Sequence, residues 1–359
     1  MFIGGGNGMA SNCQHDRRSF RSSLALALGT CLALTGETLA QTPAPDEASK
    51  GVSMLASHAP GGGYDAYARL YARHVGKHLP GQPSVTVRNM PGAAGVIMAN
   101  HIHSQAARNG AVIGLAPGAI ATAALFESPG ARYDAREFTW IGSLNNDVSV
   151  IVSRADSPVK NLQDLFSKEL IVGGAGASDN SVVHANILSR MFDAKLKLVS
   201  GYNGSGANVL ALERGEVQGI AGWNYTSVVT MKPDWIRDKH ILILLQMSLS
   251  RHKDLPDTQT ILDLARNDNE RKILQLIFTQ SVIGRVVFAP PNIPAAQTKI
   301  MRAAFDKVLL DKDFLADAAK SRLEINGPLS GEKTEALIAD LHRTPAPLVR
   351  DAIAILGKP

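Results

Sequence analysis

Short runs of aliphatic and β-branched residues alternate with longer helical patterns along most of the chain, and this alternation constrains the fold most strongly. Near-continuous Val, Ile and Leu content is typical of strands buried on both faces. The helical patterns between them are amphipathic, as at Tyr67, Tyr71, Val75 and Leu79. The alternation predicts an α/β fold with mostly parallel sheets. The predicted strands span 52–55, 85–88, 112–115, 148–152, 170–172, 196–199, 217–221 and 241–245.

Length and charge narrow the class of protein. The chain has 359 residues, of which 45% are hydrophobic and 19% charged, enough for two lobes or two domains. No stretch approaches the roughly 20 apolar residues that span a bilayer, which excludes a polytopic membrane protein. The net charge of +5 is unclustered. This charge distribution shows no basic patch of the kind that binds nucleic acid, and it allows only a modest preference for anionic ligands.

The first forty residues have the pattern of an export signal. A basic segment at 15–21 precedes an apolar run from Leu24 to Leu34, and small residues precede a cleavage site near Ala40. We expect residues 1–40 to be a signal peptide, by the general or the twin-arginine route, and 41–49 to be a short tether. An amphipathic N-terminal helix fits less well. The mature protein is then expected in the periplasm.

Both cysteines, Cys13 and Cys31, lie in this leader. The mature chain therefore needs no disulfide and has no thiolate for a metal or for nucleophilic catalysis. His74 and His78 have the four-residue spacing of a metal pair, but no Glu accompanies them as in zinc peptidases, so we expect a solvated helix face. No metal and no cofactor are expected.

Four strands are followed by turns rich in Gly, Ser or Asn that lead into helices, at 60–65, 91–95, 173–180 and 202–206. Glycine lets backbone N–H groups approach a ligand, and a helix N-terminus leaves its first donors unpaired with a partial positive charge. Each turn is thus a candidate anion site in which backbone dipoles replace lysine or arginine. Ordinary helix capping is the structural alternative. Small carboxylates, which accept several donors at once, are the ligands that fit best.

These junctions, in this order, resemble the exported substrate-binding proteins of tripartite tricarboxylate transporters, often called the Bug family. The likeness begins at Ala59–Asp65 and Arg88–Gly95 and continues through Gly201–Gly206 with Leu212–Val217 and then Val287–Pro294. It covers nearly all of the mature chain.

The resemblance implies a two-lobed periplasmic-binding-protein type II fold with the ligand cleft between the lobes. Lobe 1 would comprise 50–147 plus 285–359, and lobe 2 would comprise 148–284. In the family the first two loops hold one carboxylate of the ligand, and lobe 2 would add the turns carrying Ser178 and Ser205. The candidate ligand residues are Gly62, Gly63, Tyr64, Asp65, Gly92, Ala93, Ala94, Gly95, Ser178, Asn180, Gly204, Ser205, Gly206 and Trp223.

Several of these candidates have two interpretations. Asp65 faces the ligand or caps its helix. Trp223 and Tyr225 line the cleft or pack in the core, which is the more common role. Tyr64 is bulkier than the residue common in the family, so the pocket is narrower or gains a phenolic donor. Ala94 replaces a usual glycine.

The expected function is a non-enzymatic, monomeric periplasmic receptor that closes around a small organic carboxylate and delivers it to a membrane permease. The first alternative delivers the loaded receptor to a membrane sensor kinase. The second is an exported hydrolase that uses Ser178 or Ser205 with His184, although the chain lacks a Gly-x-Ser-x-Gly elbow.

Overall fold

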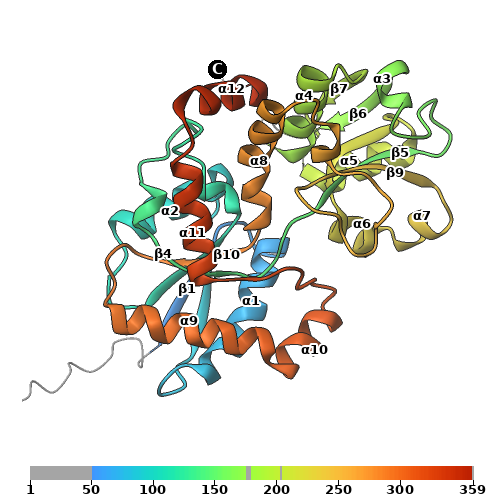
Figure 1. The fold of residues 1–359 in the computed structure, drawn as a ribbon. Coiled ribbons are helices and arrows are strands. Elements are labelled where there is room, and N and C mark those ends of the chain that lie inside the picture. The colour runs from blue at the N-terminus through green and yellow to red at the C-terminus, as the bar shows by residue number, and fades with distance from the viewer. Residues whose placement is uncertain (1–50, 175–178, 203, 358–359) are drawn as a thin grey trace, which may run out of the picture. The chain divides into compact units, whose positions relative to one another are not determined.

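The computed structural model describes residues 51–174, 179–202 and 204–357. The predicted signal peptide, the tether and Ser178 lie outside the described residues, so their roles stay predictions. The described chain is a mixed α/β protein built on two sheets, which confirms the predicted fold class (Figure 1).

The first sheet has six strands, with the order β11-β4-β10-β3-β1-β2. Four of its strands come from residues 52–143, and the other two return from residues 286–330. Their bounds are β1 (Val52–Ala56), β2 (Val85–Asn89), β3 (Val112–Ala116), β4 (Thr139–Ser143), β10 (Val286–Ala289) and β11 (Leu329–Ser330).

The second sheet has five strands, with the order β7-β6-β8-β5-β9. It is built from one continuous stretch of the chain. Its strands are β5 (Ser149–Arg154), β6 (Leu170–Gly174), β7 (Leu196–Ser200), β8 (Gly219–Asn224) and β9 (Ile241–Met247). All eight strands predicted from the sequence are present within a few residues of their expected positions.

The expectation of mostly parallel sheets is wrong. β1 pairs in parallel with β2 and β3, and β6 with β7 and β8, as the βα alternation requires. However, β10 runs antiparallel to β3 and β4, and β5 runs antiparallel to β8 and β9. These strands adjoin the two places where the chain crosses between sheets. A strand that enters a sheet by such a crossing is not tied to the right-handed helical crossover of a βαβ unit, so it is free to run the other way.

Helices cover both sheets. Two of them, α1 and α9, lie against strands of the first sheet, and α4 and α5 lie against the second. The helices are α1 (Gly63–Val75), α2 (Val96–Ser104), α3 (Asp164–Ser167), α4 (Asn180–Phe192), α5 (Gly204–Arg214), α6 (Tyr225–Met231), α7 (Pro233–Arg237), α8 (Asp268–Val282), α9 (Ala295–Leu310), α10 (Lys312–Lys320), α11 (Gly331–His342) and α12 (Ala346–Leu356).

Each sheet has its own apolar core on both of its faces. The C-terminal helix α12 adds Val349, Ala352 and Leu356 to a core cluster of the second sheet, where it packs on α4 and α8. The chain therefore returns to the second sheet after it has completed the first.

The two segments that cross between the sheets are bonded to each other. The backbone N–H of Leu144 donates to the carbonyl of Arg285 at 3.0 Å, and that of Asp147 donates to the carbonyl of Ser281 at 2.8 Å. These paired crossings are the kind of element about which two lobes can rotate.

Candidate functional site

The loop that follows β1 is held by Asp65, in the first turn of α1. The Asp65 side chain is buried, with 4% of its surface exposed. Its carboxylate accepts hydrogen bonds from the backbone N–H of Gly61 at 2.9 Å, from Arg69 Nε at 3.0 Å and from Asn89 Nδ2 at 2.7 Å. Both of its oxygens are thus engaged inside the protein. Of the two interpretations of Asp65, these contacts favour the structural one.

The same contacts bring two of the predicted junctions together. Asn89 ends β2 and also donates to the carbonyl of His58, at 2.8 Å, in the loop after β1. Farther along, a side chain at Gly95 would come within 3.3 Å of Ser57 Cβ. The loops after β1 and β2 therefore lie side by side at the carboxyl ends of their strands, where ligands of open α/β sheets bind.

The N-terminus of α1 keeps backbone donors available. Gly62 is its N-cap, and no described side chain caps it. The first N–H groups of a helix have no partner within the helix, so a 13-residue helix that begins at Gly63 presents them, with the positive end of its dipole, to the loop. An anion is the ligand that satisfies such an end best.

The second loop has an unusual backbone. Gly92, Ala93, Ala94 and Gly95 have φ values of +135°, +46°, +52° and +97°. Non-glycine residues in this region cost about 1–3 kcal/mol each, so the surrounding structure must hold the two alanines there. A side chain at Gly92 would overlap Ile97 Cδ1. This left-handed turn leads into α2, which also has no described side-chain cap.

A buried cation lies beneath the first loop, and sequence reasoning missed it. Arg285 is 8% exposed and forms an ion pair with Asp147. Its Cζ lies 4.2 Å from the ring centroid of Tyr64 and 5.0 Å from that of Tyr67. We expect backbone dipoles to hold the anion in place of lysine or arginine. The structure adds an arginine close to the first loop, although Asp147 neutralises its charge locally. The sequence feature that could have revealed Arg285 is a single arginine directly before an apolar strand.

Tyr64 and His58 stack on each other beside this cation. Their ring centroids are 4.4 Å apart with an interplanar angle of 18°. Burial raises the pKa of Tyr64 to about 12, against the opposing effect of Arg285, so the phenol keeps its proton. Burial and the charge of Arg285 lower the pKa of His58. Both rings are therefore neutral at pH 7.

In the second sheet, segments at the ends of β6 and β7 are also hydrogen-bonded to each other. The N–H groups of Gly201 and Tyr202 donate to the carbonyl of Gly174 at 3.1 and 3.3 Å. Asn208 Nδ2, in α5, donates to the carbonyl of Gly173 at 2.9 Å. The carboxyl end of β6 and the turn after β7 thus meet at one edge of the sheet.

The start of α4 differs from the start of α1. Asp179 caps α4 and accepts the N–H of Ser181 at 2.9 Å. The Asp179 carboxylate already accepts an N–H group at this helix end, so it competes with an anionic ligand there. Asn180, one of the candidate ligand residues, is exposed there.

The remaining candidates of the second sheet begin α5. Gly204 and Ser205 are its first residues, and Gly206 is exposed with nothing within 4 Å of the place where a side chain would begin. A ligand could approach this backbone closely. The candidate role of these three residues stays a prediction.

Trp223 and His184 point into the interior. Trp223 is 4% exposed and meets Trp235 edge-to-face at 6.4 Å, a packing that favours the core interpretation. His184 is 5% exposed, its Nδ1 has no partner among the described residues, and burial lowers its pKa to about 3. A neutral, enclosed imidazole of this kind gives no support to a serine–histidine hydrolase.

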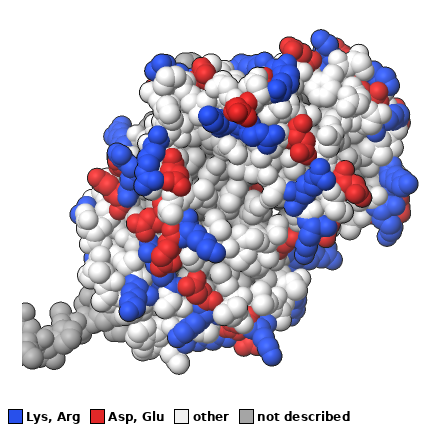
Figure 2. All heavy atoms as spheres, viewed as in Figure 1, with Lys and Arg blue, Asp and Glu red and all other residues white. Residues whose placement is uncertain are grey.

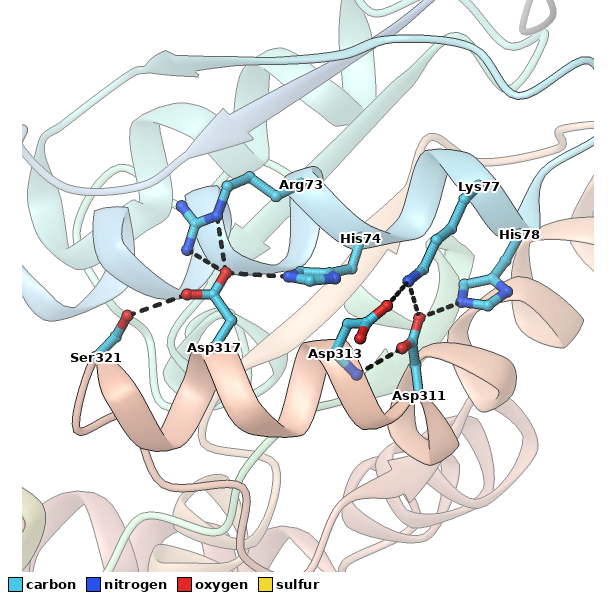
Figure 3. Close-up of polar contacts among 8 residues, drawn as sticks. All are labelled: Arg73, His74, Lys77, His78, Asp311, Asp313, Asp317 and Ser321. Atoms are coloured by element: carbon cyan, nitrogen blue, oxygen red, sulfur yellow. Dashed lines mark hydrogen bonds and ion pairs between the residues drawn. The ribbon is translucent and has the colours of Figure 1, made fainter.

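His74 and His78 are not on a solvated face. They lie opposite α10, where His74 Nε2 is 3.0 Å from Asp317 and His78 Nε2 is 2.8 Å from Asp311 (Figure 3). No cluster of metal-binding side chains occurs within 51–174, 179–202 and 204–357. The pair serves helix packing.

A cavity of about 450 Å³ lies beside Glu324, in the segment before β11. Glu324 accepts a hydrogen bond from Thr226 Oγ1 at 3.1 Å and lies 2.9 Å from His252 Nε2. Of the described residues that the sequence suggests for the ligand, only Tyr225 lines this cavity. Its lining comprises Tyr225, Thr226, Val229, Thr230, Pro233, Asp254, Ala319, Arg322, Leu323 and Glu324.

Charges are mixed on the surface. Figure 2 shows acidic and basic side chains interspersed on the face in view, with no single-sign patch of the kind that binds nucleic acid. Among the helices of the described ranges, none is long and apolar enough to cross a membrane.

Solved structures similar to this chain share its fold. One is a solute-binding protein from Polaromonas without ligand (20% identity, TM-score 0.64), which matches over 84% of this chain and 98% of its own. MatC from Rhodopseudomonas palustris, with bound malate, has 20% identity and a TM-score of 0.59 over 85% and 98% of the two chains. Another Rhodopseudomonas palustris protein, with adipate, has 18% identity and a TM-score of 0.60 over 85% and 97%.

These neighbours are two-lobed periplasmic binding proteins, receptors rather than enzymes. No curated protein matches the chain. The model of one family, described as the tripartite tricarboxylate transporter family receptor, matches residues 67–349. That span covers most of the chain and includes all of its strands except β1, together with the second predicted loop. The chain therefore belongs to the tripartite tricarboxylate transporter receptor family.

Proposed function

We propose that this chain captures a small organic carboxylate between two lobes in the periplasm and delivers it to a tripartite membrane permease. Its lobes would be 50–147 with 285–359, and 148–284, and they would rotate about the crossings near Asp147 and Arg285. The C-terminal helix α12 reaches from the first of these lobes to pack on α4 and α8 of the second. The leader at 1–40 would direct export, with cleavage near Ala40.

One observation carries the proposal: the loops after β1 and β2 are tied together by Asp65 and Asn89, next to a helix end without a described side-chain cap. This arrangement holds donors in place before a ligand arrives, which reduces the entropy lost on binding. A ligand carboxylate would accept hydrogen bonds from the backbone N–H groups at the start of α1, which lack a side-chain cap.

The magnitudes favour a ligand with more than one anionic contact. A helix end contributes about 0.3–1 kcal/mol, up to ~2 when partly buried. A micromolar complex needs about 8 kcal/mol. Hydrogen bonds to a charged group, at about 1.5–3 kcal/mol each, can supply the difference. A carboxylate that accepts from both loops, with further donors from the second lobe, reaches that total.

The ligands of the structural neighbours point to the same class. Malate is bound to MatC, and adipate accompanies the second Rhodopseudomonas palustris protein. Both are dicarboxylates, and a backbone site of the kind proposed here would bind the carboxylate group that such ligands share.

A thermal-shift screen tests the capture of carboxylates. The protein is heated alone and with saturating malonate, succinate, malate, glutarate, adipate or citrate, and with the neutral diamide succinamide as control. Ligand at about 100 times its dissociation constant adds about 2.7 kcal/mol, a rise of several degrees for a protein of this size. We expect a rise with at least one acid and none with succinamide. No response to any acid would refute the proposal.

Delivery is tested in cells. A strain that lacks this receptor should lose uptake of the acid found in the screen, and the chain should restore it. Normal uptake without the receptor, combined with a lost transcriptional response to the acid, would indicate delivery to a sensor kinase instead.

A further inference from the structure

We propose that Tyr64 sets the length of the ligand: its side chain, held by His58 and Arg285, closes one end of the site, so that the protein takes short dicarboxylates and rejects longer ones. This inference rests on the proposed function and goes beyond it, because it names the size class of the ligand and the residue that selects it.

The position of Tyr64 on the helix places its side chain near the anion site. Tyr64 is the second residue of α1, directly after Gly63, whose N–H belongs to the open helix end. Side chains on an α-helix lean toward its N-terminus, so a residue in the first turn covers the surface in front of that end. The half-buried Tyr64 ring therefore stands beside the place where a ligand carboxylate would bind.

The ring is fixed from within the protein. His58, in the preceding loop, stacks on it at 4.4 Å, and the Arg285 guanidinium lies 4.2 Å from its centroid. Stacking and cation–π contacts of this kind each stabilise one orientation. Arg285 is itself held by Asp147, so the support reaches back to the crossing segments.

Two consequences follow for a ligand. Because the ring already has its stacking partners, the protein gains little by moving it aside for a longer acid. Because the phenol stays protonated, its hydroxyl can donate to a ligand while its oxygen accepts from Arg285. A short dicarboxylate can accept from this hydroxyl, whereas extra methylenes would meet the ring.

The test compares a length series of straight dicarboxylates, from malonate and succinate through glutarate to adipate and pimelate, by calorimetric titration. In the unaltered protein we expect malonate or succinate to bind at least about tenfold more tightly than adipate, since methylenes that a pocket rejects have effects of this order. In Tyr64→Ser, which opens the end of the site, we expect the ratio of adipate to succinate affinity to rise by about tenfold or more.

Further variants separate length selection from general damage. Tyr64→Phe keeps the ring, so it should keep the preference for short ligands, but it should lower the affinity for the short acids because the hydroxyl is lost. Tyr64→Leu should shift the preference as Ser does, and it retains apolar packing if the Ser variant unfolds. Tyr67→Phe is the matched control: Tyr67 also lies over Arg285, but it is 2% exposed and bonds the carbonyl of Glu324. It should leave the length order unchanged.

The outcomes distinguish the two proposals. If the unaltered protein binds none of these acids or any other carboxylate, the proposed function fails. If it binds them but prefers adipate, or if Tyr64→Ser and Tyr64→Leu keep the original order, the function stands and the role of Tyr64 is wrong.

Discussion

Arg285 pairs with Asp147 across 138 residues of sequence, and this ion pair fastens the two segments that cross between the sheets. The side chains are only 9% and 16% exposed. Asn224 Nδ2, at the end of β8, is 3.5 Å from the same carboxylate, so the second sheet contacts the pair as well. The pair thus joins the crossing segments, about which the lobes would rotate, to Tyr64 in the first loop.

Loss of Asp147 should therefore destabilise the protein strongly. In Asp147→Ala the guanidinium of Arg285 stays buried without its partner, which typically costs about 3–5 kcal/mol. Urea unfolding at neutral pH measures the change. Asp156→Ala removes an exposed partner of Arg154 and should change the stability little. Equal effects of the two substitutions would show that the buried pair has no special role.

Asp65 should make the stability depend on acid pH. Burial alone would raise its pKa, but the hydrogen bonds from Arg69, Gly61 and Asn89 outweigh that effect and lower the pKa to about 2. A group with a lowered pKa stabilises the fold above its unfolded pKa and loses that contribution as the pH falls toward its folded pKa.

We expect Asp65→Asn to be less stable than the unaltered protein by about 2 kcal/mol at neutral pH. The difference should shrink as the pH falls below about 4. Urea unfolding at pH 7 and at pH 3 measures both values. A difference of the same size at both pH values would contradict the proposed hydrogen bonding of the carboxylate.

Asp311 should fasten α10 to α1. It accepts from Lys77 Nζ at 2.6 Å and lies 2.8 Å from His78 Nε2, and its carboxylate also caps α10 through the N–H of Asp313 (Figure 3). The hydrogen bond from Lys77, followed by that of His78, holds its pKa well below the usual range.

Asp311→Ala should cost about 1–2 kcal/mol, mainly through the lost cap, and should speed hydrogen exchange in α10. Asp313→Ala is the matched control, since Asp313 also pairs with Lys77 but its side chain is 80% exposed. If both variants exchange alike, Asp311 does not hold the helix.

Gly92 should be intolerant of a side chain for two separable reasons. Its φ of +135° disfavours any other residue, and a Cβ there would require the exposed end of the Ile97 side chain to move aside. Gly92→Ala should therefore weaken carboxylate binding by distorting the loop. Ile97→Ala in the same chain should restore part of the affinity by removing the overlap, while the backbone strain persists. Titration with the best ligand measures both variants; unchanged affinity in Gly92→Ala would remove this loop from the site.

The sequence predicts the elements of this fold well and the strand directions less well. Buried strands such as β6 are short apolar runs, which local pattern identifies. β4, β10 and β11 were not predicted, because Thr139–Ser143 is a mixed run that contains Gly142, and the other two strands are only four and two residues long. Their antiparallel direction depends on which sheet the chain enters after a crossing, which no local pattern records.

The candidate site shows the same division. The glycine loops and their helix ends are local features, and the sequence located them. The partners of Tyr64 and Asp65 are not local: Arg285 and Asn89 reach them through tertiary packing. His74 and His78 looked solvated for the same reason, since the acidic residues opposite them come more than 200 residues later.

The most direct test of the central claim is a crystal structure of the protein with the tightest carboxylate from the screen. We predict that one carboxylate group accepts backbone N–H bonds from the loops at 62–65 and 92–95, and that the ligand also contacts the turn that begins α5. A ligand bound elsewhere, such as in the cavity lined by Tyr225 and Leu323 with both loops empty, would contradict it.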